Sequence, residues 1–317
     1  MAQRPLSLKE MKQKYLAAGS APASPQLLRL LQRDPRAGAR KLRERLQKRL
    51  DRELHECERL ETMLHFEHVL WSAGIKRIAG VDEVGIGSMA GPVVAAAVVV
   101  PPDTVIRGVD DSKRLDQHRR ESLDVEIRRV ASGVSVGVVE PPEIDRLNIY
   151  HAGILAMRLA VLGLEQEPEH VLVDSRVLPD LPQPQNSFNN GDRLNFSIAC
   201  ASIVAKVYRD RLMVKLDQTY PGYGFASHKG YCTPVHQDAV RKIGPCPIHR
   251  RSFDYIRELR GEYGELFYAL KTRLQESISP ADLEEWKYGL QSVREQLSEK
   301  ENRKLRILVS RLSRRLG

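Results

Sequence analysis

An acidic pair, Asp82-Glu83, stands at the end of an apolar stretch and is followed closely by two glycines, Gly85 and Gly87. Two neighbouring carboxylates on a hydrophobic strand lose their hydration and repel each other unless a cation neutralises them. A hard divalent ion such as Mg²⁺ or Mn²⁺, which prefers oxygen ligands, is the natural compensation. The pair therefore predicts a metal site, and a structural pair without a ligand is the alternative.

The charge balance favours a polyanionic partner. The chain of 317 residues has 50 Lys and Arg against 41 Asp and Glu, a formal net charge of +9, and nucleic acid is the first candidate. Its four cysteines show no CxxC pair and no disulfide-like spacing, which indicates a reducing compartment. The N-terminus does not look like a signal peptide, and no apolar run is long enough to span a bilayer. We expect a cytoplasmic protein with no membrane partner.

Residues 1–74 are expected to form a helical N-terminal extension. The first 18 residues are charged, and residues 19–25 form a Pro-containing break of small residues. Beyond Pro35, leucines recur at helical spacing between charged residues. This spacing predicts one long amphipathic helix that stops near Gly74.

Residues 75–256 alternate between two hydrophobic periods, as an α/β layer does. The pattern predicts strands and helices in this order: strands at 77–84, 92–100 and 133–140, a helix at 144–164, a strand at 170–173 and a helix at 198–220. Strands come first and are then interleaved with helices, which predicts a mixed sheet with flanking helices.

Residues 257–317 are charged and expected to form a helical C-terminal extension. Ser279-Pro280-Ala281-Asp282 is a helix start, and apolar residues then recur at intervals of three and four as far as Leu297. The stretch 303–315 is strongly basic. A helix packed on the body is the first interpretation, and a dimer seam or a nucleic-acid clamp are the alternatives.

Two further acids are candidates for the same site as the pair. Asp174 ends the strand at 170–173, at the edge where α/β sites gather, and Asp192 follows Gly191 in a polar loop. Neighbouring strand residues face opposite sides, so Asp82 and Glu83 can share a site only if the strand ends or bulges there. Carboxylates without His or Cys are typical of two-metal phosphodiester hydrolysis and unlike zinc sites. The alternative is that Asp192 is an ordinary turn residue with no part in catalysis.

The glycines after the acidic pair have two possible uses. Residues 85–90 fit the GxGxxA dinucleotide fingerprint of an oxidoreductase, but a strand rather than a helix is expected to follow. Close backbone approach to a sugar 2′-OH is the other use. Residues 220–231 interleave aromatic rings with His228 and Lys229, which suits stacking beside phosphates or simple loop packing. Arg250 and Arg251 are phosphate contacts or part of a solvated loop.

Several ordered blocks between about residues 78 and 253 resemble ribonuclease HII, the type 2 bacterial ribonuclease H. They are IAGVDEVGIG, AGPVVAAAV, DDSKRL, EIDRLNI, VLVDS, the GD at 191–192, ASIVAKVYRDRLM, YPGYGFASHKGY and GPCPIHRRSF. The resemblance implies an RNase H-like fold and a Mn²⁺- or Mg²⁺-dependent endonuclease that leaves 5′-phosphomonoesters. Its implied substrates are RNA–DNA hybrids and duplex DNA with embedded ribonucleotides, as in ribonucleotide excision repair. It names no protein partner.

Residue by residue, the resemblance implies a metal-binding set, a fourth active-site acid and a group of substrate contacts. The metal ligands are Asp82, Glu83 and Asp174; the fourth acid is Asp192; the substrate contacts are Gly85, Ile86, Gly87, Ser202 at a phosphate and Tyr231 at the sugar of the RNA–DNA junction.

Two positions depart from the family's pattern, and Asp174-Ser175 in place of the common Asp-Gly is the smaller departure. The family has Gly-Arg-Gly where this chain has Gly85-Ile86-Gly87. We therefore expect weaker substrate binding and poorer selectivity for an isolated ribonucleotide. The alternative function is a hybrid-binding protein with weakened catalysis.

Overall fold

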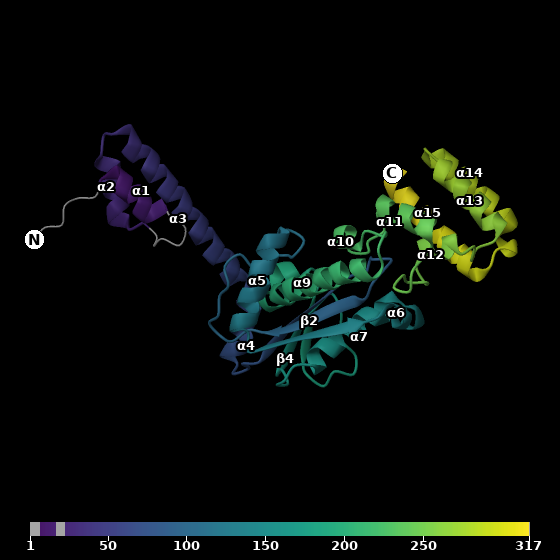
Figure 1. Ribbon diagram of the computed structural model, residues 1–317, viewed down its shortest axis with the longest axis horizontal. Helices are drawn as coiled ribbons and strands as arrows, with labels where there is room; N and C mark the ends of the chain where they lie inside the picture. Colours follow the sequence, from purple (N-terminus) through teal and green to yellow (C-terminus); the bar gives the residue numbers. More distant parts are fainter. Residues whose placement is uncertain (1–6, 17–22, 317) are drawn as a thin grey trace, which may run out of the picture. The chain divides into compact units, whose positions relative to one another are not determined.

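The computed structural model of the protein describes residues 7–16 and 23–316 (Figure 1). The chain divides into two compact units. The first comprises Met1–Val84, Val94–Val138 and Gly153–Arg209, and the second Gly85–Val93, Val139–Ala152 and Asp210–Gly317. None of the helices in the described ranges combines the length and apolar character that crossing a membrane requires. The boundaries expected near residues 74 and 256 stay a prediction.

A five-stranded mixed sheet forms the centre of the α/β body, in the order β3-β2-β1-β4-β5. The strands are β1 (Ile78–Val84), β2 (Val93–Val99), β3 (Gly133–Val139), β4 (His170–Asp174) and β5 (Gln185–Phe188). β1 pairs with β2 antiparallel and with β4 parallel, and β4 pairs with β5 parallel. The predicted mixed sheet is confirmed.

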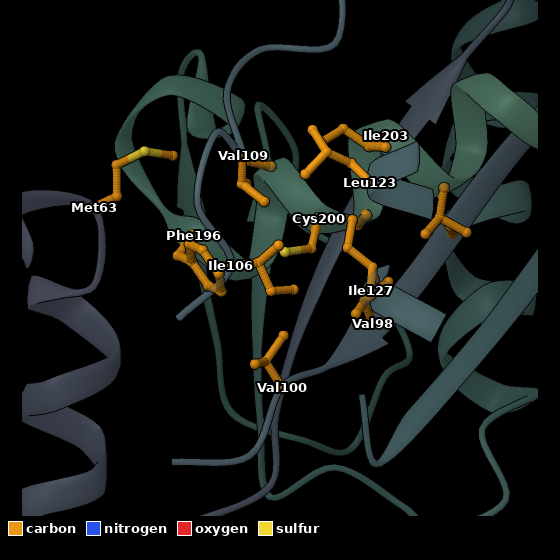
Figure 2. Close-up of a cluster of buried hydrophobic side chains, with 14 of the residues drawn as sticks. Met63, Val98, Val100, Ile106, Val109, Leu123, Ile127, Phe196, Cys200 and Ile203 are labelled. Carbon is orange, nitrogen blue, oxygen red and sulfur yellow. The ribbon is translucent and has the colours of Figure 1, made fainter. Parts of the chain in front are cut away.

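The core of the first unit lies between the sheet and its long helix α9 (Phe196–Thr219). Every residue of β2 is buried, and its Val and Ala side chains leave room for a helix packed close to the sheet. Figure 2 shows Phe196, Cys200 and Ile203 of α9 in one cluster with Val98 of β2 and Ile127 of α5 (Gln117–Val130). The predicted helix at 198–220 is confirmed, with its start two residues earlier.

Helix α9 approaches β1 at Gly80. A Cβ atom on Gly80 would lie 2.1 Å from the carbonyl carbon of Ser197, so that only glycine fits between the strand and the first turn of the helix. Gly80 lies two residues before Asp82, and Ser197 five residues before Ser202. This contact therefore fixes the start of α9 beside the end of the strand that carries the acidic pair.

The N-terminal helices form a small cluster of their own. They are α1 (Leu8–Leu16), α2 (Pro25–Arg33), α3 (Ala37–Met63) and α4 (His65–Ser72). Leu31 of α2 and Leu42 and Leu46 of α3 are buried together, and Figure 1 shows α1 and α2 beside the first half of α3. The predicted break at 19–25 falls largely outside the described residues.

The expectation of one helix from residue 35 to near Gly74 is wrong, because the helix is interrupted at Leu64. The buried carboxylate of Glu67 in α4 accepts a hydrogen bond of 2.9 Å from the backbone N–H of Ser197. Since the free N–H groups of a first helical turn need acceptors, α4 is turned to satisfy α9.

The helix expected at 144–164 is also two helices, α6 (Pro141–Leu147) and α7 (Ile149–Leu162). Asn148 separates them with a φ of 72°, and its side-chain oxygen accepts hydrogen bonds from the N–H groups of Tyr150 and His151. This positive φ ends α6, and the side chain of Asn148 caps the helix that follows.

The C-terminal part of the second unit contains two groups of helices. The first is α10 (Phe225–His228), α11 (Pro234–Ile243) and α12 (Asp254–Leu259); the second is α13 (Glu265–Glu276), α14 (Pro280–Val293), the short 3₁₀ helix η1 (Arg294–Gln296) and α15 (Glu299–Leu316). The predicted helix start is confirmed, because Ser279 and Asp282 form a capping box. The pattern that ran on to Leu297 is not one helix, since α14 ends at Val293. In Figure 1, α13, α14 and α15 lie side by side around a core that includes Trp286.

Candidate active site

The acidic pair and Asp174 meet where two parallel strands separate. The pairing of β1 with β4 ends at Val81 and Val173, so Asp82 and Asp174 are the next residues on neighbouring strands. Asp82, Glu83 and Asp174 each place one carboxylate oxygen within 4.8 Å of the others.

The way in which Asp82 and Glu83 reach one site differs from the expectation. β1 neither ends nor bulges at the pair, because Glu83 is still in register with Ala95 of β2. What ends is the pairing with β4 on the other side. The space that opens there, together with the longer side chain of Glu83, allows both carboxylates to reach the same point.

The cluster is electrostatically unfavourable in the protein alone. Burial raises the pKa of Asp82 well above its usual value, and the carboxylates of Glu83 and Asp174 raise it further, while a hydrogen bond from Ser202 opposes the rise. Burial also raises the pKa of Glu83, and the guanidinium of Arg176, 3.5 Å from Glu83 Oε1, opposes this change. The site therefore holds more negative charge than its surroundings compensate.

The donor atoms fit a hard divalent cation. Among the described residues, Glu83 Oε2 is buried and has no hydrogen-bond partner. The three residues Asp82, Glu83 and Asp174 offer only carboxylate oxygens, which Mg²⁺ and Mn²⁺ prefer, and no thiol or imidazole. These residues could hold the ion that the resemblance implies.

Asp192 joins the site through the short helix α8 (Gly191–Leu194). The N–H of Gly191 donates a 2.6 Å hydrogen bond to Asp174 Oδ1, and a Cβ atom on Gly191 would lie 2.7 Å from Ile198 Cδ1. Burial raises the pKa of Asp192, with further contributions from Asp111 and Asp174. Asp192 lies near enough to raise the pKa of Asp82 as well, although it is not one of the three converging ligands.

Two cations border the acids, and the sequence prediction did not assign them to the site. Arg176 contacts Glu83, and Lys113 Nζ lies 3.9 Å from Asp192 Oδ2. Burial lowers the pKa of Lys113, but the charges of Asp192 and Asp82 outweigh this effect and raise it. Two features of the sequence could have assigned these cations to the site. Arg176 lies two residues after Asp174, and Lys113 lies in the DDSKRL block.

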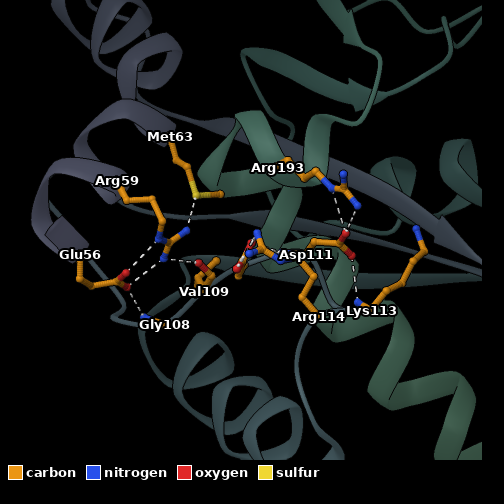
Figure 3. Close-up of polar contacts among 10 residues, drawn as sticks. Glu56, Arg59, Met63, Gly108, Val109, Asp111, Lys113, Arg114 and Arg193 are labelled. Atoms are coloured by element: carbon orange, nitrogen blue, oxygen red, sulfur yellow. Dashed lines mark hydrogen bonds and ion pairs between the residues drawn. The ribbon is translucent and has the colours of Figure 1, made fainter. Parts of the chain in front are cut away.

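The loop that carries Lys113 is held by Asp111. Figure 3 shows the buried Asp111 carboxylate accepting hydrogen bonds of 3.0 and 2.9 Å from Arg193, and one of 2.9 Å from the backbone N–H of Lys113. Burial acts to raise the pKa of Asp111, but these hydrogen bonds hold it below its usual value. Asp111 thus stays charged and links the Lys113 loop to α8.

Ser202, the predicted phosphate contact, lies inside the protein. Its hydroxyl is 2.9 Å from that of Ser112, and it also hydrogen-bonds to Asp82. In this arrangement Ser202 positions Asp82. A contact with a phosphate stays a prediction.

The remaining predicted substrate contacts belong to the second unit. Tyr231 pairs with Ser88 in an isolated antiparallel bridge, next to the loop of Gly85, Ile86 and Gly87. The ring of Tyr231 is partly exposed, whereas Tyr223 and Phe225 are buried in the core and cannot stack on a ligand.

The sequence predicts that Arg250 is a phosphate contact or part of a solvated loop. Both predictions are wrong. The side chain is fully buried, and it donates hydrogen bonds to the carbonyl oxygens of Gly91 (2.9 Å) and Ile86 (3.2 Å). Arg250 therefore holds the backbone of the glycine loop from within. The neighbouring Arg251 is exposed, and its N–H donates to Asp145.

The mixed sheet and the acidic cluster at its edge define an α/β protein with an RNase H-like fold. The crystal structure of ribonuclease H2 from Pyrococcus horikoshii matches with a TM-score of 0.52 and 28% identity, over 59% of this chain and 98% of that one. The family model of ribonuclease HII matches residues 79–256, and that of the ribonuclease HII N-terminal domain matches residues 7–71.

Curated relatives agree with this match. A ribonuclease HII from Myxococcus xanthus is 49% identical over 256 residues, which cover 80% of this chain and 87% of the relative. One from Anaeromyxobacter is 48% identical over 265 residues, which cover 83% and 84%. The chain belongs to the ribonuclease HII family. It is an endoribonuclease, a phosphodiester hydrolase with ribonuclease H activity.

Proposed function

We propose that the protein hydrolyses the RNA strand of RNA–DNA hybrids and also cuts duplex DNA at embedded ribonucleotides, with Mg²⁺ or Mn²⁺ as cofactor. The observation that carries this proposal is the convergence of carboxylate oxygens from Asp82, Glu83 and Asp174 within 4.8 Å. The buried Glu83 Oε2 atom, which has no hydrogen-bond partner in the described part of the chain, supports it.

Asp82, Glu83 and Asp174 would hold the divalent ions. When bound, the ions supply an activated water and stabilise charge at the scissile phosphate. Arg176 engages Glu83 Oε1 and so leaves Oε2 for a ligand. Because the pKa of Asp82 is raised, a bound cation must displace a proton from the cluster at low pH.

The other residues act on the geometry of the site and on the substrate. Asp192, paired with Lys113, would complete the acidic site without binding the ions directly. Gly85 and Gly87 would present backbone groups to a 2′-OH, with Tyr231 against the sugar. The side chain of Ile86 offers no charge to a phosphate, so we expect its contribution to substrate binding to be small.

Cleavage assays test the proposal directly. A uniform RNA–DNA hybrid and a DNA duplex with one ribonucleotide are incubated with the wild-type protein in Mg²⁺ and in Mn²⁺, and both are expected to be cut with 5′-phosphate products. Asp174→Asn should lower the rate by more than the roughly 10–100-fold that loss of a supporting residue costs at a metal site. Asp180→Asn, at a largely exposed side chain, is the matched control.

Full strand scission by the Asp174→Asn variant in the presence of metal would refute the proposed site. Binding of both substrates by the wild type without cleavage would favour the alternative, a hybrid-binding protein with weakened catalysis. Cleavage of the uniform hybrid alone would refute the embedded-ribonucleotide activity and leave the hydrolase assignment intact.

A further inference from the structure

Helix α15 carries a large share of the chain's positive charge. Its 18 residues include seven Lys and Arg against two Glu, which gives +5 of the formal +9 of the whole chain. The neighbouring helix α14 is acidic, with Asp282, Glu284 and Glu285 against a single Lys287. Positive and negative side chains are therefore separated onto two adjacent helices. On an ordinary solvated surface the two signs are mixed.

The two faces of α15 differ in character. Leu305 and Leu312 are buried against a core that contains Phe267 and Trp286. The opposite side exposes five arginines, which we call the α15 basic face: Arg303, Arg306, Arg311, Arg314 and Arg315. Since the apolar side fixes the rotation of the helix, the arginines are held on one surface.

The arginines of the α15 basic face differ from the lysines of the same helix in their ion pairs. Among residues 7–16 and 23–316, none of the five forms an ion pair with a carboxylate, whereas Lys300 and Lys304 of the same helix pair with Glu262 and Asp254. The acids near the helix are thus used by its lysines. Arg306 Nε and Arg314 Nε donate hydrogen bonds to the backbone carbonyls of Asn302 (3.4 Å) and Ser310 (3.3 Å), but among the described residues the five guanidinium charges have no carboxylate partner.

We infer that the α15 basic face binds the phosphate backbone of duplex nucleic acid without reading its sequence. Arginine can donate two parallel hydrogen bonds to one phosphate group. At 1.5 Å per residue, Arg303 and Arg315 are about 18 Å apart along the helix, a length over which duplex DNA presents about ten charges. The choice of occupant rests on the proposed function. The family match ends at residue 256 and does not include α15.

Salt-dependent binding tests this inference. The full-length protein is titrated against a fluorescent 30-base-pair DNA duplex without ribonucleotides, in EDTA so that no cleavage occurs, over a series of NaCl concentrations. The test variant combines Arg303→Gln, Arg306→Gln, Arg311→Gln and Arg314→Gln. Losing four phosphate contacts should reduce the slope of log K against log [NaCl] by about 3–4. Between 50 and 200 mM salt, wild-type affinity should then fall about 100-fold more than that of the variant.

The control variant removes the same charge elsewhere. Its substitutions are at exposed arginines of α2 and α3: Arg33→Gln, Arg40→Gln, Arg45→Gln and Arg52→Gln. Circular dichroism and thermal melts check that both variants are folded. We expect the control to keep more of the wild-type slope than the α15 variant does.

An unchanged slope in the α15 variant, or an equal reduction in the control, would overturn the inference. A loss of self-association in sedimentation velocity with an unchanged slope would also overturn it, because the occupant would then be a second copy of the chain. Cleavage is measured separately with Mg²⁺. If the wild type failed to cleave, the proposed function would be refuted, while the slopes would still decide whether α15 binds duplexes.

Discussion

Replacing Gly80 by alanine should disrupt the contact on which the active-site strand depends. The added Cβ would lie 2.1 Å from Ser197 C, 2.3 Å from Ser197 O and 2.4 Å from Ile198 N. Carbon atoms in van der Waals contact are about 3.5–4.0 Å apart, so the first turn of α9 must retreat by roughly 1.5 Å. All three atoms belong to the backbone, and no side chain can rotate away to relieve the clash.

The cost has two parts. Overpacking a core typically costs about 1–3 kcal/mol even where side chains can adjust. The retreat also breaks the 2.9 Å hydrogen bond from Ser197 N–H to the buried Glu67, and an unsatisfied buried group costs about 1–3 kcal/mol. We therefore expect Gly80→Ala to lower the free energy of unfolding by about 2–6 kcal/mol. Cleavage should slow as well, because Ser202 moves with α9 away from Asp82.

Urea unfolding, followed by circular dichroism, measures the stability change from the shift in midpoint at constant m-value. Gly289→Ala is the matched control, because a Cβ atom at this exposed position of α14 would meet nothing within 4 Å. In a helix interior that change should stabilise by about 1 kcal/mol. A loss of less than about 1 kcal/mol in Gly80→Ala would contradict the reasoning, since it would mean that strand and helix can separate without cost.

Three further predictions concern charge. Asp82→Asn should raise the melting temperature in EDTA, because it removes a buried carboxylate that its neighbours repel. The same substitution should abolish the stabilisation that Mg²⁺ gives the wild type. A lower melting temperature in EDTA would contradict this prediction. Burial lowers the pKa of His236 and of His249 to about 4, so the unfolded chain takes up protons first and stability should fall as the pH drops from 6.5 towards 4. The raised carboxylate pKa values act in the opposite direction, so urea midpoints at pH 7 and 5 are compared with those of a His236→Asn, His249→Gln variant, whose loss should be smaller. Ile86→Arg should tighten substrate binding and sharpen selectivity for a single ribonucleotide over a uniform hybrid; equal affinity and selectivity in both proteins would show that the departure at this position has no effect.

The elements that the sequence predicted well are those with long apolar runs. Strands β1 to β4 and helix α9 begin and end within two residues of expectation, because long apolar runs leave few other positions for their boundaries. β5 was missed, since its sequence, QNSF, is mostly polar and does not alternate. Its place in the sheet depends on the pairing with β4, which spacing along the chain does not reveal.

The two helices that proved to be broken depended on information of different kinds. The break at Asn148 has a local cause, a residue with positive φ whose side chain caps the next helix, and asparagine at that position was a readable signal. The break at Leu64 has a distant cause. Glu67 caps α9 at Ser197, 130 residues further along the chain, and no periodicity of the N-terminal segment contains that contact.

The same distinction explains which parts of the candidate site could be predicted. An acidic pair on an apolar strand is visible in the sequence because it contradicts the local pattern, and such contradictions tend to mark function. The groups that make the pair tolerable are not visible in this way. Arg176 meets Glu83 across 93 positions of the chain, and Arg250 holds the carbonyl of Ile86 from 164 positions away, although its own sequence context resembles a solvated basic loop.

The residues predicted to bind metal and those predicted to bind the sugar lie in different units. Asp82, Glu83, Asp174 and Asp192 all belong to the first unit, whereas the glycine loop and Tyr231 belong to the second. The carboxylates of Glu83, Asp174 and Asp192, which raise the pKa of Asp82, all lie in the first unit, so we expect cation binding to depend on the packing of that unit. The groups proposed to contact the sugar depend instead on Arg250 and the core around Phe225. Since each set is held by the packing of its own unit, we expect a substitution such as Ile86→Arg to change substrate binding while all four acids keep their surroundings.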